Sequence, residues 1–282
     1  MDPEDVTLVM PCYNTAGTLP AALNAVTRLD PQPSTILCVD DGSTDGTKSI
    51  IESYDGVRLV EHEENQGLGT TLNTALSRTE TPLFAKVDAD VVVPSDWLAR
   101  ILDAYAESGA TLVQGRFIEQ ETTAADRWRS KYPSPRFEQH SRRNKALNGA
   151  TILAGVDALR DIGGYDERYK RAFDDIDVME RLMEAGYDVY YAPSVRSTHI
   201  RTDTWREVLR TEWAYHNDPQ YGGEPDDLSD VLHRLRDHCY ESGRCVYLDV
   251  KHREYERLWI SALRLPYMIA WDLDHVLFAD DS

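Results

Sequence analysis

Three pairs of acidic residues recur along this chain, each beside an apolar run or at the start of a helical pattern. They are Asp40 and Asp41 in VDDGSTDGT, Asp88 and Asp90 in VDADVVVP, and Asp174 and Asp175 in FDDIDVMERL. Carboxylates suit Mg2+ and Mn2+ as ligands, and a carboxylate can also accept the proton of a hydroxyl group. The pairs together predict a site that holds a nucleotide through a divalent cation and deprotonates an acceptor.

The first two pairs follow strand-like segments, TILCVDD and LFAKVDAD. Their carboxylates should therefore lie at the carboxyl ends of neighbouring strands, where open α/β sheets bind ligands. A D-x-D triplet in a loop is also common as a solvated turn. Asp88 and Asp90 therefore indicate a metal site only in combination with the other motifs.

The elements that must position these acids alternate between strand and helix at intervals of roughly 25 residues, which is typical of a parallel α/β sheet. Strands are expected over 6–13, 34–40, 57–62, 83–88, 111–117, 150–155 and 188–200, and helices over 19–29, 45–54, 67–78, 95–108, 156–164 and 174–187. Ser95 is a candidate N-cap and Gly186 a candidate C-cap residue.

We expect residues 1–205 to form the catalytic domain, with a nucleotide half over about 1–115 and an acceptor half over about 116–205. Residues 120–147 are polar, rich in Arg and without a clear period, which predicts an irregular segment with some helix. Residues 206–282 should form a helical C-terminal extension.

The charge of the chain excludes some partners. Its 49 acidic and 30 basic residues give a net charge of −19, which opposes binding to nucleic acid or to an anionic lipid surface. Arg outnumbers Lys by 24 to 6 and the acids are spread along the chain, which favours a surface adapted to high salt over an ordinary acidic cytosolic protein.

We expect a cytoplasmic protein without a membrane span. The N-terminal MDPEDVTLVM lacks the features of a secretory signal, and the most apolar C-terminal run is interrupted by Arg264, Pro266, Asp272 and Asp274. Cys12 and Cys38 read as core residues. The spacing of His233, His238, Cys239 and Cys245 fits no common zinc site.

In their order and spacing, MPCYN, VDDGSTDGT, ENQGLGTTLN, VDADV, GGYDERY, FDDIDVMERLMEAGY and the His of APSVRSTH resemble the family 2 inverting glycosyltransferases of the GT-A fold. The resemblance covers roughly residues 6 to 215. It implies a Rossmann-like, mostly parallel central sheet flanked by helices, and a nucleoside-diphosphate sugar, UDP-sugar favoured, as donor.

The same resemblance assigns roles to individual residues. It implies that Asp90 ligates Mn2+ or Mg2+, with Asp88 on the ribose or a metal-bound water and His199 as a second protein ligand, although a His after a strand is often structural. It places Asp40, Asp41 and Tyr13 at the base and ribose. Pro11, Asn14, Asn65 and Gly67 are further contacts to the nucleotide.

An inverting displacement needs a base on the face of the sugar opposite the leaving diphosphate. Asp175 matches the second acid of the family's Glu-Asp pair, and Asp174 replaces the Glu. That departure leaves open which member of the pair points inward, and both could simply stabilise a helix N-terminus.

One motif invites a different interpretation. Residues 41–52 nearly fit an EF-hand calcium loop, but the strand-like STILCVD before them argues against it, because such a loop follows a helix. We interpret this segment as a strand-to-helix turn in which Gly42 relieves the backbone and Ser43 or Asp45 caps the helix.

The acceptor is less defined. The processive Gln-x-x-Arg-Trp motif is missing, which favours transfer of one sugar per encounter, to a glycan or to a polyprenyl-phosphate carrier at the inner face of the membrane. Trp259, Leu263, Met268, Ile269 and Trp271 could contact that membrane, cover the catalytic domain or form a dimer contact. A catalytically inactive glycan- or partner-binding relative and a sugar-phosphate nucleotidyltransferase are the competing functions.

Overall fold

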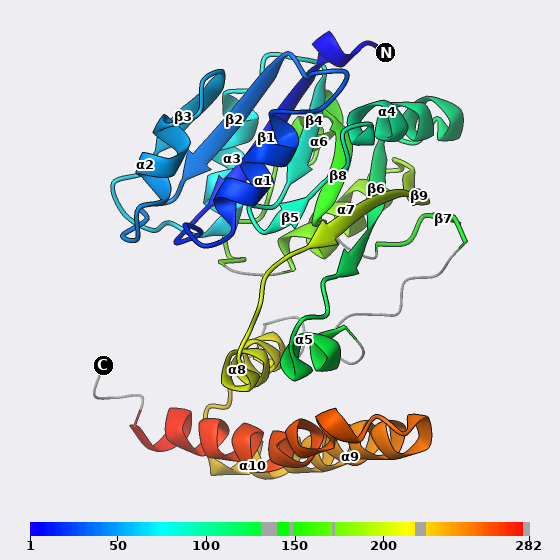
Figure 1. Cartoon of the computed structure of the whole chain (residues 1–282). Helices are drawn as coiled ribbons and strands as arrows, with labels where there is room; N and C mark the ends of the chain where they lie inside the picture. Colours follow the sequence, from blue (N-terminus) through cyan, green and yellow to red (C-terminus); the bar gives the residue numbers. More distant parts are fainter. Residues whose placement is uncertain (131–139, 147–148, 171–172, 218–223, 279–282) are drawn as a thin grey trace. The chain divides into compact units, whose positions relative to one another are not determined.

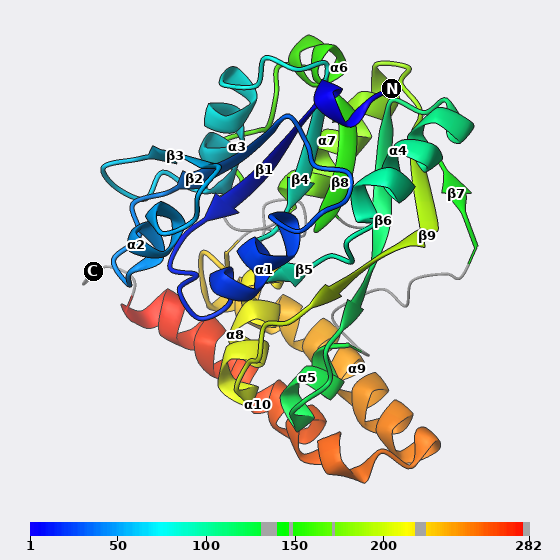
Figure 2. The same ribbon diagram turned by 45° about the horizontal axis from the view of Figure 1, so that its top comes forward.

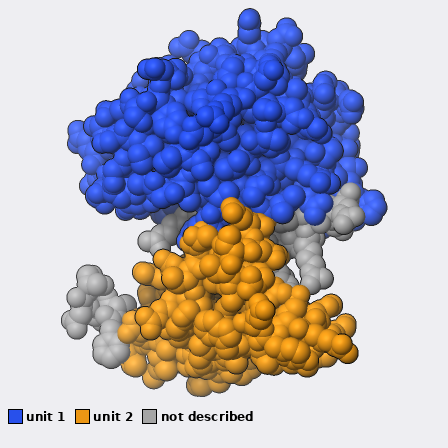
Figure 3. All heavy atoms as spheres, viewed as in Figure 1, with its two compact units in different colours: residues 1–118, 137–201 blue, residues 119–136, 202–282 orange. Residues whose placement is uncertain are grey.

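The computed structural model describes residues 1–130, 140–146, 149–170, 173–217 and 224–278. The chain forms two compact units, which Figure 3 distinguishes by colour. Unit 1 comprises residues 1–118 and 137–201, and unit 2 comprises residues 119–136 and 202–282.

The described residues of unit 1 form one sheet of nine strands (Figure 1). The strand order is β3-β2-β1-β4-β8-β6-β9-β5, and β7 pairs with β9 outside this path. The strands are β1 (Val6–Cys12), β2 (Thr35–Asp40), β3 (Val57–Glu61), β4 (Leu83–Val87), β5 (Val91–Val92), β6 (Leu112–Glu119), β7 (Arg142–Arg143), β8 (Thr151–Gly155) and β9 (Val189–His199).

The first four strands in this order run parallel, because β1 pairs in parallel with β2 and β4, and β2 with β3. The antiparallel pairings involve the later strands: β8 with β4 and β6, and β9 with β5 and β7. The parallel half thus brings the ends of β1, β2 and β4 to one edge of the sheet.

Helices cover both faces of this sheet, as Figures 1 and 2 show. Alternate residues of β1 point to opposite faces, so that Leu8 and Met10 pack in one core cluster and Val9 in the other. The first cluster includes side chains of α1 (Leu19–Val26), α2 (Thr47–Glu52) and α4 (Trp97–Ser108), and the second those of α3 (Leu68–Ser77), α6 (Val156–Asp161) and α7 (Asp174–Glu184). A short 3-10 turn, η1 (Pro3–Asp5), precedes β1.

Unit 2 is helical. Its helices are α5 (Ala124–Arg129), α8 (Trp205–His216), α9 (Leu228–His252) and α10 (Tyr255–Phe278). Its core includes Trp128, Leu209, Ile260 and Met268. No helix in the described part of the chain is long and apolar enough to cross a membrane.

The predicted α/β fold is confirmed, and several local details differ from the sequence-based expectations. Gly46, not Ser43 or Asp45, occupies the N-cap position of α2, although the Asp45 carboxylate accepts a hydrogen bond from the Thr47 amide. Asp96, not Ser95, occupies the N-cap position of α4, and the carbonyl of Ser95 instead accepts a hydrogen bond from the Asp30 amide. Residues 119–136, expected in the acceptor half of the catalytic domain, belong to unit 2. The short strands β5 and β7 were not expected, because two residues are too few to show a period.

Candidate active site

Asp41, the residue after β2, is hydrogen-bonded to the turn that precedes α3. Asp41 is buried, and its carboxylate accepts hydrogen bonds from the amides of Gln66 (2.9 Å) and Gly67 (2.8 Å). The same carboxylate lies 2.7 Å from Nδ1 of His62, at the end of β3. Asp41 therefore fixes the Asn65–Gly67 turn from behind, and its buried oxygens already have protein partners.

Asp40 and Asn14 tie the loop after β1 to the loop after β2. The Asp40 carboxylate accepts hydrogen bonds from the amide and hydroxyl of Ser43. The Ser43 hydroxyl in turn accepts a hydrogen bond from the Asn14 amide (2.8 Å), and the Asn14 side chain accepts one from the Thr44 amide (2.8 Å). Gly42 is required here, because it has a φ of +70° and a Cβ atom would lie 2.6 Å from the backbone of Glu64.

A hollow of about 870 Å3 opens in front of this turn. Volumes of about 300–1,000 Å3 are typical of small-molecule sites. Tyr13 and Asn65, both predicted to contact the nucleotide, line it, and Tyr13 is 48 % exposed. The other lining residues are Glu64, Gln66, Thr70, Glu167 and Lys170. The predicted nucleotide contacts that do not line it are Pro11, half-buried within β1, the buried Asp40, Asp41 and Gly67, Asn14 in the adjoining loop, and Asp88 after β4.

Loop 164–170 supports the same turn. The Lys170 ammonium donates to the carbonyl of Gln66 (2.7 Å), and the amides of Leu68 and Gly69 donate to the carbonyls of Lys170 and Tyr169. A Cβ atom on Gly67, whose φ is +97°, would lie 2.4 Å from the Lys170 side chain. The close approach of Lys170 therefore requires a glycine at position 67.

A buried lysine lies at the centre of the acidic residues. Lys86, on β4, is only 3 % exposed and its ammonium lies 2.9 Å from the Asp88 carboxylate. The ammonium also donates to the carbonyl of Gly149 (3.1 Å). Burial opposes its charge, but the charges of Asp88, Asp174 and Asp175 outweigh burial and raise the pKa of Lys86 above its ordinary value.

Two of these carboxyl groups titrate at unusually high pH. Burial raises the pKa of Asp174 to about 7 and that of Asp88 to about 6, against the effect of the Lys86 charge. The charge of Asp175 adds to both shifts. Asp88 is therefore half ionised at about pH 6 and Asp174 at about pH 7, and Lys86 and Asp175 influence both groups.

The two members of the Asp174–Asp175 pair have different environments at the start of α7. Asp174 is 3 % exposed, and its Oδ2 atom has no hydrogen-bond partner among the described residues. Asp175 is half-buried, and its Oδ2 atom accepts a hydrogen bond from the Gly149 amide (2.5 Å). A Cβ atom on Gly149 would lie 2.2 Å from Cβ of Asp175, so only glycine allows this contact.

Asp90 and His199 are brought together by the pairing of β5 with β9. Val91 lies opposite His199 in that pair, and Nε2 of His199 is 3.0 Å from the Asp90 carboxylate. Burial favours a higher pKa for Asp90, but the hydrogen bond and charge of His199 outweigh burial and lower it. Asp90 therefore remains ionised at neutral pH.

These donors suit a hard divalent cation. Mg2+ is commonly bound by one or two carboxylates together with substrate phosphates, so a complete cage of protein ligands is not required. Across the described ranges, no three His, Cys, Asp or Glu side chains lie close enough to ligate one ion by themselves. Asp90 and His199, with Asp88 two residues away, fit a cation that shares its coordination with a diphosphate.

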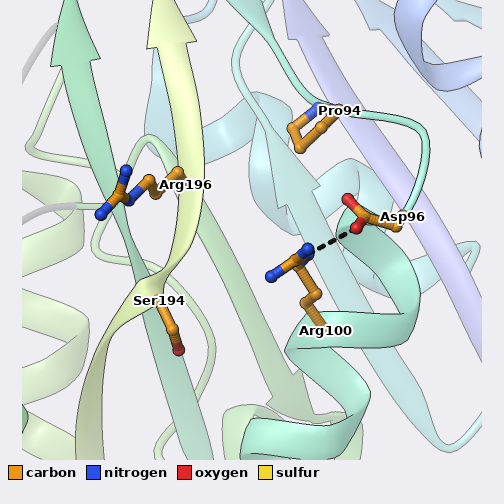
Figure 4. Close-up of a pocket in the computed structure, with 5 residues that line it drawn as sticks. All are labelled: Pro94, Asp96, Arg100, Ser194 and Arg196. Carbon is orange, nitrogen blue, oxygen red and sulfur yellow. Dashed lines mark hydrogen bonds and ion pairs between the residues drawn. The ribbon is translucent and has the colours of Figure 1, made fainter.

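A second hollow, of about 390 Å3, lies elsewhere on unit 1 (Figure 4). Pro94, Asp96, Arg100, Ser194 and Arg196 line it, and Arg100 pairs with Asp96 at 2.6 Å. None of the predicted site residues belongs to it.

Residues 7–162, more than half of the chain, match the model of glycosyl transferase family 2. The chain belongs to this family. It is 29 % identical over 203 residues to glycosyltransferase AglE of Haloferax volcanii, covering 69 % of this chain and 66 % of AglE. The chain spans about half the length of several other curated relatives that it matches.

Two solved structures share the GT-A fold of this family 2 glycosyltransferase. Mannosyltransferase PcManGT from Pyrobaculum calidifontis, solved with GDP-Man and Mn2+, has a TM-score of 0.59 and 19 % identity, with 100 % of this chain and 77 % of that chain covered. TarS 1–349 from S. aureus, solved with UDP, has a TM-score of 0.54 and 21 % identity, with 76 % and 65 % covered.

Sequence reasoning missed four residues that contact the candidate site residues: Lys86, Gly149, His62 and Lys170. Lys86 could have been found, because it is a charged residue inside the apolar run LFAKV, two positions before Asp88. His62 follows β3 and so obeys the same strand-end rule as Asp41. Gly149 and Lys170 gave no such signal, because their importance depends on contacts with segments distant in sequence.

Proposed function

We propose that this glycosyltransferase transfers one sugar, with inversion, from a nucleoside-diphosphate sugar to an acceptor hydroxyl or phosphate in a metal-dependent reaction. The observation that carries the proposal is the arrangement around Lys86. The buried ammonium of Lys86 lies 2.9 Å from the Asp88 carboxylate of the D-x-D segment, and the charges of Asp174 and Asp175 at the start of α7 also act on it. Asp90, two residues after Asp88, lies 3.0 Å from His199. Donor-side and acceptor-side carboxylates thus belong to one cluster.

Asp175 is our candidate for the base. It is more accessible than Asp174, and the Gly149 amide fixes one of its oxygens. Each carboxylate oxygen has a second lone pair, so Asp175 can still accept the acceptor proton. Asp174 lies deeper and beside Lys86, and we assign it the role of positioning this cluster.

The donor would occupy the hollow beside Tyr13 and Asn65, with the turn held by Asp41 behind it. Asp90, Asp88 and His199 would hold Mn2+ or Mg2+. When bound, such a cation stabilises the negative charge that grows on the leaving diphosphate. The similar structures solved with UDP and with GDP-Man and Mn2+ support this proposal, and among donors we favour a UDP-sugar.

For the acceptor we propose a glycan or a polyprenyl-phosphate-linked sugar at the cytoplasmic face of the membrane. Of the C-terminal residues considered for membrane contact, Met268 lies in the core of unit 2, and Leu263 and Trp271 pack against that core. Ile269 is half-buried, whereas Trp259 is 44 % exposed and packs edge-on against Trp205. Trp259 is therefore the residue through which such a contact would first be tested.

Thermal unfolding with UDP-, GDP- and dTDP-sugars, in Mn2+ and in EDTA, tests donor binding. A ligand present at about 100 times its Kd stabilises the native state by about 2.7 kcal/mol, so the correct donor should raise Tm measurably in Mn2+. Asp90→Asn should lose most of this gain, and Asp96→Asn, which removes a carboxylate outside the site, should keep it. Equal stabilisation in EDTA and Mn2+ would argue against metal-dependent binding. Donor binding without transfer to any acceptor would favour an inactive, ligand-binding relative.

A further inference from the structure

Helix α9 in unit 2 has an exposed row of apolar residues in addition to its buried face. Its inner face, which includes Val231, His238, Ser242, Cys245 and Asp249, is buried, and α9 lies against α10. Leu228, Leu232, Tyr247 and Val250 are between 48 % and 69 % exposed. Together with the exposed Cys239 and Gly243 they recur at helical spacing and form one line along α9, which we name the outer stripe.

The outer stripe is long enough for a helix-sized partner. Leu228 and Val250 are 22 positions apart, which corresponds to roughly 33 Å of α-helix. Arg236 lies beside the stripe with its guanidinium paired to Asp237 at 3.2 Å, so that its aliphatic stem can cover apolar surface. An extended apolar surface of this kind commonly marks an interaction site.

Gly243 lies near the middle of the stripe, and no contact or backbone angle within the chain requires a glycine at this position. A Cβ atom there would meet nothing within 4 Å, and its φ is not among the positive ones. Glycine inside a helix lowers helix stability relative to alanine. Gly243 lies in the middle of a 25-residue helix, and its lack of a side chain would let the backbone of another helix approach α9 closely at this point.

The charges at the two ends of α9 indicate which kind of helix would pack against the outer stripe. Asp226, Asp227 and Asp230 stand at its N-terminal end, and Lys251 and Arg253 at its C-terminal end. Glu254 and Glu256, which follow, are paired with Arg257 and Arg127. A second α9 lying antiparallel would place each acidic end opposite a basic end. With Cys239 opposite Gly243, Leu232 faces Val250, and the contact is the same on both copies, as a two-fold axis requires.

We propose that two copies of this chain pair through the outer stripe, antiparallel, about a two-fold axis between Cys239 and Gly243. An anionic lipid surface fits this face less well, because α9 carries equal numbers of acidic residues and of Lys and Arg, whereas surface-bound helices are rich in Lys and Arg. Salt screens the attraction between the helix ends as well as the repulsion between two chains of net charge −19, and the stripe itself is apolar, so pairing should persist in molar KCl.

Molar mass measured by light scattering across a dilution series, in molar KCl, tests the pairing. The wild-type chain should approach twice the mass of one chain as concentration rises. Gly243→Gln improves helix propensity but blocks close approach, and Leu232→Glu places a charge in the stripe; each should raise the Kd of the dimer at least tenfold. Leu277→Glu makes the same change at an exposed leucine of α10 and should leave the mass unchanged.

Cross-linking reports the register. Two Cys239 residues would be offset along the axis by four helical positions, roughly 6 Å, so a short bis-maleimide should join them. Cys12, Cys38 and Cys245 are buried, and Cys239→Ser should abolish the product. A monomeric wild-type chain at all concentrations, or a dimer unaffected by both stripe variants, overturns the proposal. A dimer that does not cross-link through Cys239 overturns the register, and vesicle binding lost in Leu232→Glu would assign the stripe to a membrane.

Discussion

Replacing Asp174 by asparagine is expected to change how the free energy of unfolding depends on pH. The pKa of Asp174 is raised to about 7 in the folded protein, against an ordinary value of 3.8. Between these values the folded state retains a proton that the unfolded state has released, so the wild-type protein loses stability as pH rises through this window. Well above the folded-state pKa the loss is complete.

The size of the effect follows from the shift. Between about pH 4.5 and pH 8, one carboxyl group with these two pKa values lowers the free energy of unfolding by about 3 kcal/mol. The amide that replaces the carboxyl group in Asp174→Asn cannot titrate, so the variant should gain about 3 kcal/mol relative to wild type over the same range. The constant cost of a buried amide cancels, because only the change between the two pH values is compared.

Urea unfolding at about pH 4.5, 6 and 8 measures this difference. Asp166→Asn is the matched control, because Arg168 lowers the pKa of Asp166 to about 2. Its folded and unfolded pKa values both lie below this pH range, so its difference from wild type should stay constant. If the Asp174→Asn difference is also constant, the buried carboxylate does not have the environment described above.

Three further predictions address the cluster and the medium. Lys86→Met leaves Asp88 and Asp174 without their buried cation and should cost about 3 kcal/mol in urea unfolding at pH 8, partly recovered by adding Asp174→Asn; an unchanged stability would contradict the central role of Lys86. Gly149→Ala should displace Asp175 and lower kcat with little change in donor affinity, and an unaltered kcat would show that this contact is dispensable. Stability followed by circular dichroism, and transferase activity, should rise from about 50 mM toward molar KCl, and full stability at the low end would rule out salt adaptation.

The sheet, and the edge of it that carries the candidate site, were largely predictable, because they depend on local signals. Apolar runs such as TILCVD and LFAKV are buried strands, and an acid immediately after such a run must lie at the strand end. The direction of β8 was not predictable, since an apolar strand looks the same in either orientation. Its antiparallel pairing with β4 is what brings Gly149 and Ala150 beside Lys86 and Asp88.

The difference between Asp174 and Asp175 also lies beyond sequence reasoning. The two residues are identical and adjacent, and only the packing of α7 in unit 1 makes one buried and the other accessible. Likewise, the sequence could not show that the Asp41 carboxylate, predicted to contact the nucleotide, also accepts hydrogen bonds from the amides of Gln66 and Gly67. Such roles depend on the partners of each individual oxygen.

The rate of sugar transfer by Asp175→Asn, measured beside its affinity for the donor, tests the central claim most directly. Asn has nearly the same size and shape as Asp but cannot accept the acceptor proton, so transfer should fall by about 10²- to 10⁴-fold while donor affinity and folding change little. Asp90→Asn should instead weaken metal-dependent donor binding. Near-normal transfer by Asp175→Asn, with Asp174→Asn inactive, would show that the base is Asp174, and normal transfer by both variants would contradict the proposed mechanism.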